Sequence, residues 1–110
     1  MVILFKPYHE PLIMAVPPKK WQTRRLWKKW RVKVGGLYWM STSLFDKTKR
    51  FGRMKVLRRW EESLGSISDK DAIAEGYANP TAYFEAFARI NRGKTALNTT
   101  VKCVEFEVAR

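Results

Sequence analysis

Two strand patterns, one near each end of the chain, most constrain what this sequence can fold into. From position 104 to 108, valine and phenylalanine alternate with glutamate, which is typical of a half-buried strand with an acidic outer face. Near the other end, Val2 to Phe5 is a short apolar run that indicates a buried strand. Helix signals lie between the two, so we predict an α+β fold whose terminal strands pair in a partly closed β-barrel.

Turn signals and hydrophobic patterns divide the first half of the chain. A short helix is predicted from about Tyr8 to Ala15, whereas residues 21–34 have no clean period and indicate irregular or extended chain. Two strands are then predicted, Leu37 to Ser43 and Arg50 to Trp60. The apolar alternation of the second strand breaks at Leu57, which predicts a β-bulge there.

Two helices are predicted in the second half. Ser68 and Asp71 have the spacing of a capping box, and Gly76 is placed to end the short helix that follows it. Asn79 can cap the next helix, with Pro80 at its first position. The helices therefore fall between the predicted strands, as an α+β fold requires.

Length and composition predict one domain. The chain has 110 residues, of which 45% are hydrophobic and 14% aromatic, enough to build a core. At roughly 100 to 200 residues per domain, we expect a single domain spanning residues 1–110. The longest apolar runs are five residues, too short for a membrane span or a signal peptide, so we expect a cytoplasmic protein.

One cysteine and one histidine limit the metal and redox chemistry open to the chain. Cys103 cannot form an internal disulfide, and we predict an ordinary strand residue there. His9 has no cysteine or histidine partner at zinc spacing, so we expect it at the surface or at a helix cap. The sequence also contains no glycine-rich loop of the Walker or dinucleotide type. We therefore expect neither a metal nor a cofactor.

Basic residues are concentrated in the first half of the chain. Residues 1–59 contain 16 basic and 2 acidic residues, a net charge of +14, whereas residues 60–110 have a net charge of −2. Lysine and arginine neutralise phosphates, so we expect the first half to bind RNA. Trp21, Trp27 and Trp30 lie among these charges; exposed indoles can stack on bases, but we expect core burial for them. The predicted nucleic-acid contacts are Lys19, Lys20, Arg24, Arg25, Lys28, Lys29, Arg31, Arg50 and Arg53.

A short motif near residue 20 has a recognisable pattern. The residues Lys20, Thr23 and Arg25, preceded by Pro18, resemble the signature of the ASCH family, Gly-x-Lys-x-x-Glu-x-Arg, in which threonine replaces the glutamate in several branches. Further matches follow in the family's order along nearly the whole chain: an entrance strand and helix at residues 5–8, a turn at 34–37, a helical motif at 71–77 and a last strand at 104–106. The departure is Pro18, because proline removes a backbone donor that the family's glycine supplies.

The resemblance implies a PUA-like β-barrel of five or six strands, with helices across its openings and a cleft lined by the signature residues. The family is generally proposed to bind RNA. Some small bacterial members remove the acetyl group from N4-acetylcytidine, using a lysine, a threonine and a glutamate at the places of Lys20, Thr23 and Glu75, and others are described as ribonucleases. This sequence keeps all three residue types. Since Pro18 can shift the loop beside Lys20, we place RNA binding through a nucleotide-accepting cleft first and amidohydrolase activity second; a ribonuclease and a protein-binding module are further alternatives.

These three residue types form a chemically sensible set. Thr23 is a hydroxyl nucleophile that needs a base, and Lys20 can serve if burial, Arg24 and Arg25 depress its pKa. Glu75 can orient the amine or pass a proton to the leaving nitrogen if it lies within hydrogen-bond reach. In the alternative interpretation, Lys20 and Arg25 bind phosphate, Thr23 is an ordinary strand residue, and Glu75 pairs with an arginine. We expect the geometry of the site, closed cavity or open groove, to discriminate between the two.

Overall fold

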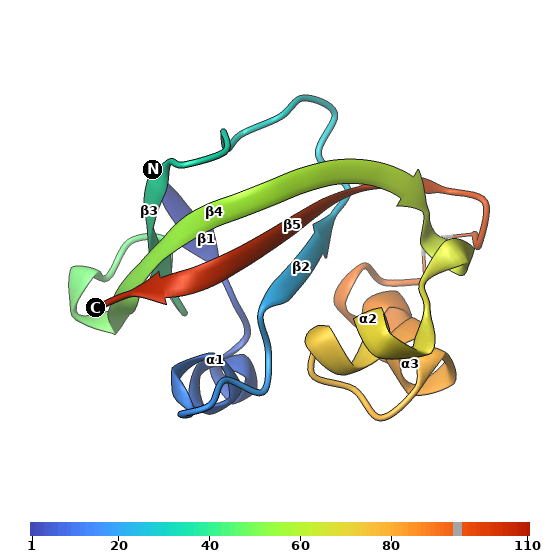
Figure 1. The fold of residues 1–110 in the computed structure, drawn as a ribbon, viewed down its shortest axis with the longest axis horizontal. Helices are drawn as coiled ribbons and strands as arrows, with labels where there is room; N and C mark the ends of the chain where they lie inside the picture. Colours follow the sequence, from blue (N-terminus) through green and yellow to red (C-terminus); the bar gives the residue numbers. More distant parts are fainter. Residues whose placement is uncertain (94–95) are drawn as a thin grey trace.

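The structure is a computed structural model that describes residues 1–93 and 96–110, and its fold is α+β, as predicted. The strands are β1 (Val2–Leu4), β2 (Gln22–Arg25), β3 (Leu37–Ser41), β4 (Arg50–Ser63) and β5 (Thr100–Ala109). The helices are α1 (Glu10–Met14), α2 (Asp69–Ala74) and α3 (Pro80–Ile90), with short 3-10 helices at η1 (Pro7–His9), η2 (Lys47–Lys49) and η3 (Leu64–Ser66). β4 and β5 run side by side across the molecule as long curved strands; α1 lies below one end of them, and α2 and α3 lie below the other (Figure 1). No helix within the described ranges has the length and apolar character needed to cross a bilayer.

The five strands form one mixed sheet in the order β1-β3-β4-β5-β2. Neighbouring strands are antiparallel except at one edge, where β1 lies parallel to β3 with Val2 opposite Trp39. The expectation that the terminal strands pair is therefore wrong. β5 already has β4 on one side and β2 on the other, which leaves it no free edge for β1.

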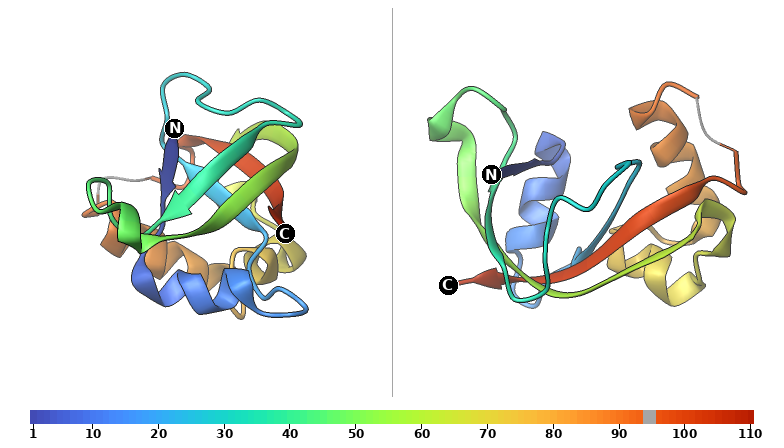
Figure 2. Two further views of the ribbon diagram at one scale, coloured as in Figure 1. Left: turned by 90° about the vertical axis from the view of Figure 1, so that its left-hand side faces the viewer. Right: turned by 90° about the horizontal axis from the view of Figure 1, so that it is seen from above.

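The sheet is curved, but it does not close into the expected barrel (Figure 2). Its two edge strands, β1 and β2, have only three and four residues. Within residues 1–93 and 96–110, no ladder of hydrogen bonds joins these edges. The chain passes from β1 to β2 through η1 and α1, so a helical segment connects the two edges where a barrel would need paired strands.

Two buried clusters of side chains lie on opposite faces of β5, because successive residues of a strand point to opposite sides. Val104 and Phe106 belong to the first cluster, which also contains Ile13 of α1. Val101 and Cys103 belong to the second cluster, which packs against α2 and α3. The predicted alternation of buried and more exposed side chains is present from residue 104 onward. Before residue 104, Val101 and Cys103, which point to the opposite face of β5, are buried as well. The helices at both ends of the sheet account for this, since they cover different faces.

Local signals in the sequence are confirmed where they depend only on near neighbours. The Ser68 hydroxyl accepts a hydrogen bond from the backbone N–H of Asp71 at 3.0 Å, at the start of α2. The Asn79 side chain accepts one from the Ala82 N–H at 2.9 Å, at the start of α3. The register of β4 against β5 shifts around Leu57, as a bulge requires.

Candidate active site

β2 and the end of α2 bring Lys20 and Glu75 together although 55 positions separate them in the sequence. Trp21 donates its backbone N–H to the Ala74 carbonyl at 2.8 Å, which ties the start of β2 to the last turn of α2. Gly76 then ends α2 at φ +97°, and a Cβ at this position would lie 3.6 Å from the Lys20 Cβ. Glycine therefore permits the turn, and the tighter contact that a Cβ would make here is with Leu12 Cδ1, at 3.1 Å.

The loop that carries Lys20 is anchored to α1. The backbone N–H groups of Lys19 and Lys20 both donate to the Leu12 carbonyl, at 2.8 and 3.2 Å. Pro18, at the place of the glycine in the signature that this segment resembles, comes just before this pair and has no N–H of its own. The two donors that follow Pro18 are thus used to fix the loop and to direct Lys20 inward.

The Lys20 ammonium is buried and surrounded by acceptors. Its side chain is 2% exposed, and Nζ donates to Glu75 Oε1 and to the Glu75 carbonyl at 2.8 Å each, and to the Gln22 carbonyl at 3.0 Å. Burial lowers the pKa of Lys20, and Arg25 and Arg24 lower it further, whereas the Glu75 carboxylate opposes this shift. The net direction is downward, as a lysine acting as a base requires.

Glu75 is shared between two cations. Its Oε1 accepts from Lys20, and its Oε2 accepts from Arg24 Nη1 at 3.0 Å. The Arg24 guanidinium also donates to Gln22 Oε1 at 2.9 Å and to Asp71 Oδ2 at 3.3 Å. Arg24 was expected to contact nucleic acid, but its charge is directed into the protein and is balanced there by carboxylates.

Thr23 and Arg25 lie on the same face of β2, because they are two residues apart on one strand. Arg25 Nε donates to Thr23 Oγ1 at 2.9 Å, and the Arg25 guanidinium lies 4.8 Å from the centre of the Phe5 ring. Burial lowers the pKa of Arg25 to about 10, so it remains charged at neutral pH. Since Arg25 is the donor in this bond, the hydroxyl proton of Thr23 is directed elsewhere and is available to a base.

Lys20, Thr23 and Glu75 converge on one cavity of about 370 Å³. Arg25 also lines it, so every residue of the sequence motif that carries a reactive or charged group borders the same space. A second cavity, of about 540 Å³, reaches Lys20 from the side of Trp21, but neither Thr23 nor Glu75 lines it. The smaller cavity is therefore the candidate active site.

An aromatic wall that the sequence did not reveal borders the candidate site. It consists of His9, Tyr77, Tyr83 and Phe87, with neighbouring rings of the wall 5.8 to 6.0 Å apart. The rings are packed edge-to-face or tilted against one another, so they give the cavity a rigid, largely apolar side. Tyr77 directly follows the Glu75-Gly76 part of the helical motif, and this position could have drawn attention to it.

His9 is buried at the cavity, so the expected surface position is wrong, whereas the expected cap position is present: His9 is the N-cap residue of α1, although its side chain makes no capping hydrogen bond. Its exposed fraction is 6%, and its Nε2 lies 3.0 Å from the Tyr77 hydroxyl. Burial, together with the charges of Lys20 and Arg25, lowers the pKa of His9 to about 3. The imidazole is therefore neutral at physiological pH. A single histidine in a turn-prone segment carries no sequence signal for this role, because η1 and the end of α2 meet only in the folded chain.

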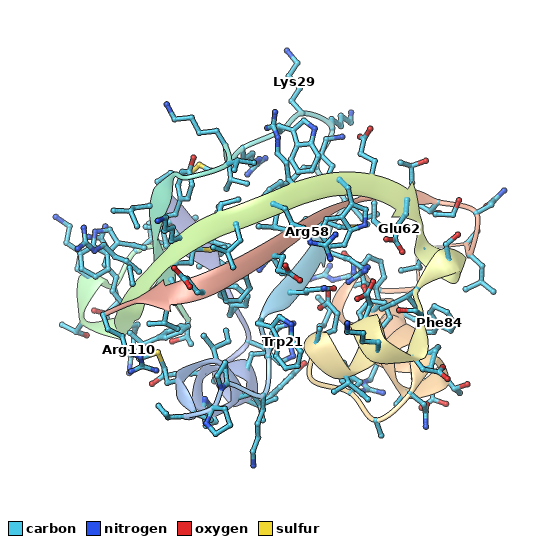
Figure 3. The ribbon with its side chains drawn as sticks, viewed as in Figure 1. Trp21, Lys29, Arg58, Glu62, Phe84 and Arg110 are labelled. Carbon is cyan, nitrogen blue, oxygen red and sulfur yellow. The ribbon has the colours of Figure 1, made fainter. Side chains whose placement is uncertain are left out.

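The remaining predicted nucleic-acid contacts divide by exposure. Lys29 points away from the body of the protein (Figure 3). Arg50 is half-buried, whereas Lys20 and Arg24 are buried and Arg25 faces the cavity. The exposed members of the predicted set are Lys19, Lys28, Lys29, Arg31 and Arg53.

The tryptophans are less buried than expected, and basic groups lie over their rings. Trp27 and Trp30 pack against the first cluster but remain half-buried, and Trp21 is half-buried as well. Trp39, which the sequence did not single out, is 40% exposed, and the guanidinium groups of Arg50 and Arg53 lie 5.4 and 5.7 Å from its ring centre. These rings lie at the edges of the core because the charged residues beside them must reach water.

The open mixed sheet with short helices at its ends defines the class of fold, which is that of the ASCH domain. In particular, the chain is similar to the crystal structure of an ASCH domain from Lactobacillus crispatus, with a TM-score of 0.68 over 97% of this chain and 77% of that one. It is also similar to a protein of Enterococcus faecalis from the family DUF984, with a TM-score of 0.74 over 98% of this chain and 75% of that one. Both are 16% identical to it, so the likeness concerns the fold. No protein-family description and no curated protein matches the sequence.

Proposed function

We propose that this protein hydrolyses the amide of an N4-acylated cytosine nucleoside, with Thr23 as the nucleophile and Lys20 as the base. The observation that carries this proposal is the convergence of Lys20, Thr23 and Glu75 on one cavity of about 370 Å³. That volume lies within the range of about 300 to 1,000 Å³ that is usual for small-ligand sites. The substrate class follows from the motif, because ASCH proteins that deacetylate N4-acetylcytidine have the same three residue types at these places.

In the proposed reaction, the Thr23 oxygen attacks the amide carbonyl carbon, and its proton passes to the neutral Lys20 amine. The guanidinium of Arg25, beside Thr23, stabilises the negative charge that develops on the carbonyl oxygen. The C–N bond then breaks, and the cytosine nitrogen takes the proton from Lys20. Water next attacks the carbonyl carbon of the acyl-threonine ester and gives a proton to Lys20. The ester C–O bond to Thr23 then breaks, Lys20 returns the proton to the Thr23 oxygen, and the acid is released.

The resting geometry sets one requirement for this chemistry. All three Lys20 donors are engaged by Glu75 and Gln22, and Thr23 is bonded to Arg25. A proton can therefore pass from Thr23 to Lys20 only when the amine is neutral, either directly or through one bridging water. Burial of Lys20 favours the neutral amine, and Glu75 holds the nitrogen in place.

Acetate release from N4-acetylcytidine tests the proposal. Lys20→Met and Glu75→Gln are expected to lower turnover by at least about a hundredfold, which is the usual contribution of general acid–base catalysis. The matched control is Lys19→Met, because Lys19 is the exposed neighbour of Lys20 and loses the same charge. Circular dichroism confirms that each variant is folded. Absence of acetate release by the unaltered protein at any pH, or equal loss in Lys19→Met, would refute the proposal.

RNA binding by the basic surface is a second candidate function, and the exposure of Trp39 favours it. Its ring remains 40% exposed with the guanidinium groups of Arg50 and Arg53 at 5.4 and 5.7 Å from its centre, so it combines a stacking surface with two groups that can bind phosphate. Trp39→Ala is expected to weaken binding of single-stranded RNA by about 1 to 3 kcal/mol, as loss of one stacked base does. The control is Trp21→Ala, because Trp21 is a half-buried tryptophan that lines the second cavity; this variant is expected to leave RNA affinity unchanged. Equal affinity of the Trp39 variant and the unaltered protein, measured by fluorescence anisotropy, would exclude this surface.

A further inference from the structure

The structure places Arg24 at the centre of a buried network of charges. The Arg24 side chain is 0% exposed, and its Nη1 donates to Gln22 Oε1 at 2.9 Å and to Glu75 Oε2 at 3.0 Å. Its Nη2 lies 3.3 Å from Asp71 Oδ2 and 3.5 Å from Glu62 Oε1. Burial of a charge is costly unless it is paired in this way. Apolar residues of similar volume can often replace such a network without loss of stability, so stability alone does not explain why Arg24 is here.

The far side of this network reaches the surface. The Asp71 and Glu62 side chains are 24% and 18% exposed, whereas Glu75 is 4% exposed. Arg24 thus connects two half-exposed carboxylates to the one carboxylate that contacts Lys20.

We propose that Arg24 is a positioning residue, which holds Oε2 of Glu75 so that Oε1 meets Lys20, and which limits how strongly Glu75 retains the lysine proton. The geometry supports this role, because one carboxylate is held at 2.8 Å by Lys20 and at 3.0 Å by Arg24, on different oxygens. The positive charge of Arg24 competes with Lys20 for Glu75. Arg24 does not touch the reacting atoms in this scheme, and the inference rests on the proposed amidohydrolase function.

The other groups that face Lys20 do not provide this control. Arg25 of β2 also favours loss of the lysine proton, but it bonds to Thr23 rather than to Glu75. His9 of η1 is neutral, and Tyr77 and Tyr83, from the segment after α2 and from α3, are neutral phenols because burial raises the pKa of each. Arg24 is therefore the charged neighbour that acts on Lys20 through Glu75.

Two substitutions with opposite effects test the inference. Arg24→Met removes the competitor for Glu75, so the acidic limb of the pH–rate profile is expected to move up by about one unit, with about a tenfold loss of rate below the limb. Asp71→Asn leaves Arg24 with one carboxylate fewer, so Arg24 is drawn more strongly to Glu75 and the limb is expected to move down. Asp71 is partly exposed, so this second variant tests the inference even if Arg24→Met does not fold.

The control and a second readout separate this inference from the proposed function. Lys55→Met removes an equal charge from an exposed position of β4 that makes none of the contacts of the Arg24 network, and it is expected to leave the limb in place. NMR titration of the Lys20 ε-methylene signals reports the same shifts without any substrate, so it tests Arg24 even in a protein that releases no acetate. Opposite shifts in the two variants support the positioning role. No shift in the Lys20 titration, or shifts of the same sign, would overturn it.

Discussion

Arg25 donates its Nε hydrogen to the Thr23 hydroxyl at 2.9 Å, from two residues further along the same strand. This contact places a positive charge beside the oxygen that we propose as the nucleophile. It also leaves the hydroxyl proton free to point toward a base. The Phe5 ring, 4.8 Å from the guanidinium, keeps Arg25 in position. In the proposed reaction, the Thr23 oxygen thus accepts a hydrogen bond from Arg25 while its own proton can be donated to Lys20.

Substitution of Thr23 tests whether its hydroxyl reacts. Thr23→Ser keeps the oxygen and is expected to retain acetate release from N4-acetylcytidine within about tenfold, whereas Thr23→Val has a similar shape without the hydroxyl and is expected to lose at least about a hundredfold. Thr42→Val is the control, because Thr42 also lines the cavity. Thermal melting checks that the variants are folded. Comparable turnover in Thr23→Val and Thr42→Val would show that the hydroxyl is not the nucleophile.

Burial of His9 predicts a specific dependence of stability on pH. Its pKa is lowered to about 3 from an ordinary 6.5, so between these values the unfolded chain binds a proton that the folded protein does not. The contribution of His9 to stability is therefore complete above pH 6.5 and is lost as the pH falls toward 3. The expected slope is up to about 1 kcal/mol per pH unit, allowing for solvent screening.

His9→Gln is the matched variant for this measurement, because the glutamine amide can replace the imidazole as a hydrogen-bonding group near Tyr77 but does not titrate. The free energy of unfolding is measured by urea denaturation from pH 4 to 7 for both proteins. The unaltered protein is expected to lose stability relative to His9→Gln as the pH falls, since other acidic transitions affect the two alike. A difference that stays constant across this range would mean that His9 is not held neutral by the fold.

The basic surface predicts a salt dependence for RNA binding. Each phosphate that the protein neutralises contributes about −0.7 to the slope of log affinity against log salt for a single strand. Replacement of Lys28, Lys29 and Arg31 by glutamine is therefore expected to make the slope shallower by about 2. The control replaces Lys70, Arg89 and Arg92, which carry the same charge but belong to the acidic half of the chain. A slope that is unchanged in the first triple variant, or changed equally in both, would argue against phosphate contacts at residues 28–31.

Several features of this protein were readable from the sequence because they depend on residues only a few positions apart. Ser68 and Asn79 cap their helices with neighbouring backbone groups, and Leu57 marks its bulge by interrupting a local alternation. The α+β class follows from the order of these local elements. The relation of Lys20 to Thr23 was also local, since a family signature of a few residues carries it.

Only the tertiary structure decided what depends on burial and on distant pairing. β5 pairs with β4 and β2 and has no free edge for β1. β1 therefore pairs with β3, and the sheet remains open. In the sequence, Arg24 is one of many basic residues and was predicted to contact nucleic acid. In the folded protein it is buried and bonds to Glu75, which is 51 positions away. His9 is neutral because of burial in the folded chain and because of the positive charges of Lys20 and Arg25. Solvent exclusion and Coulomb interaction depend on distance in space, and the chain sets those distances only when it has folded.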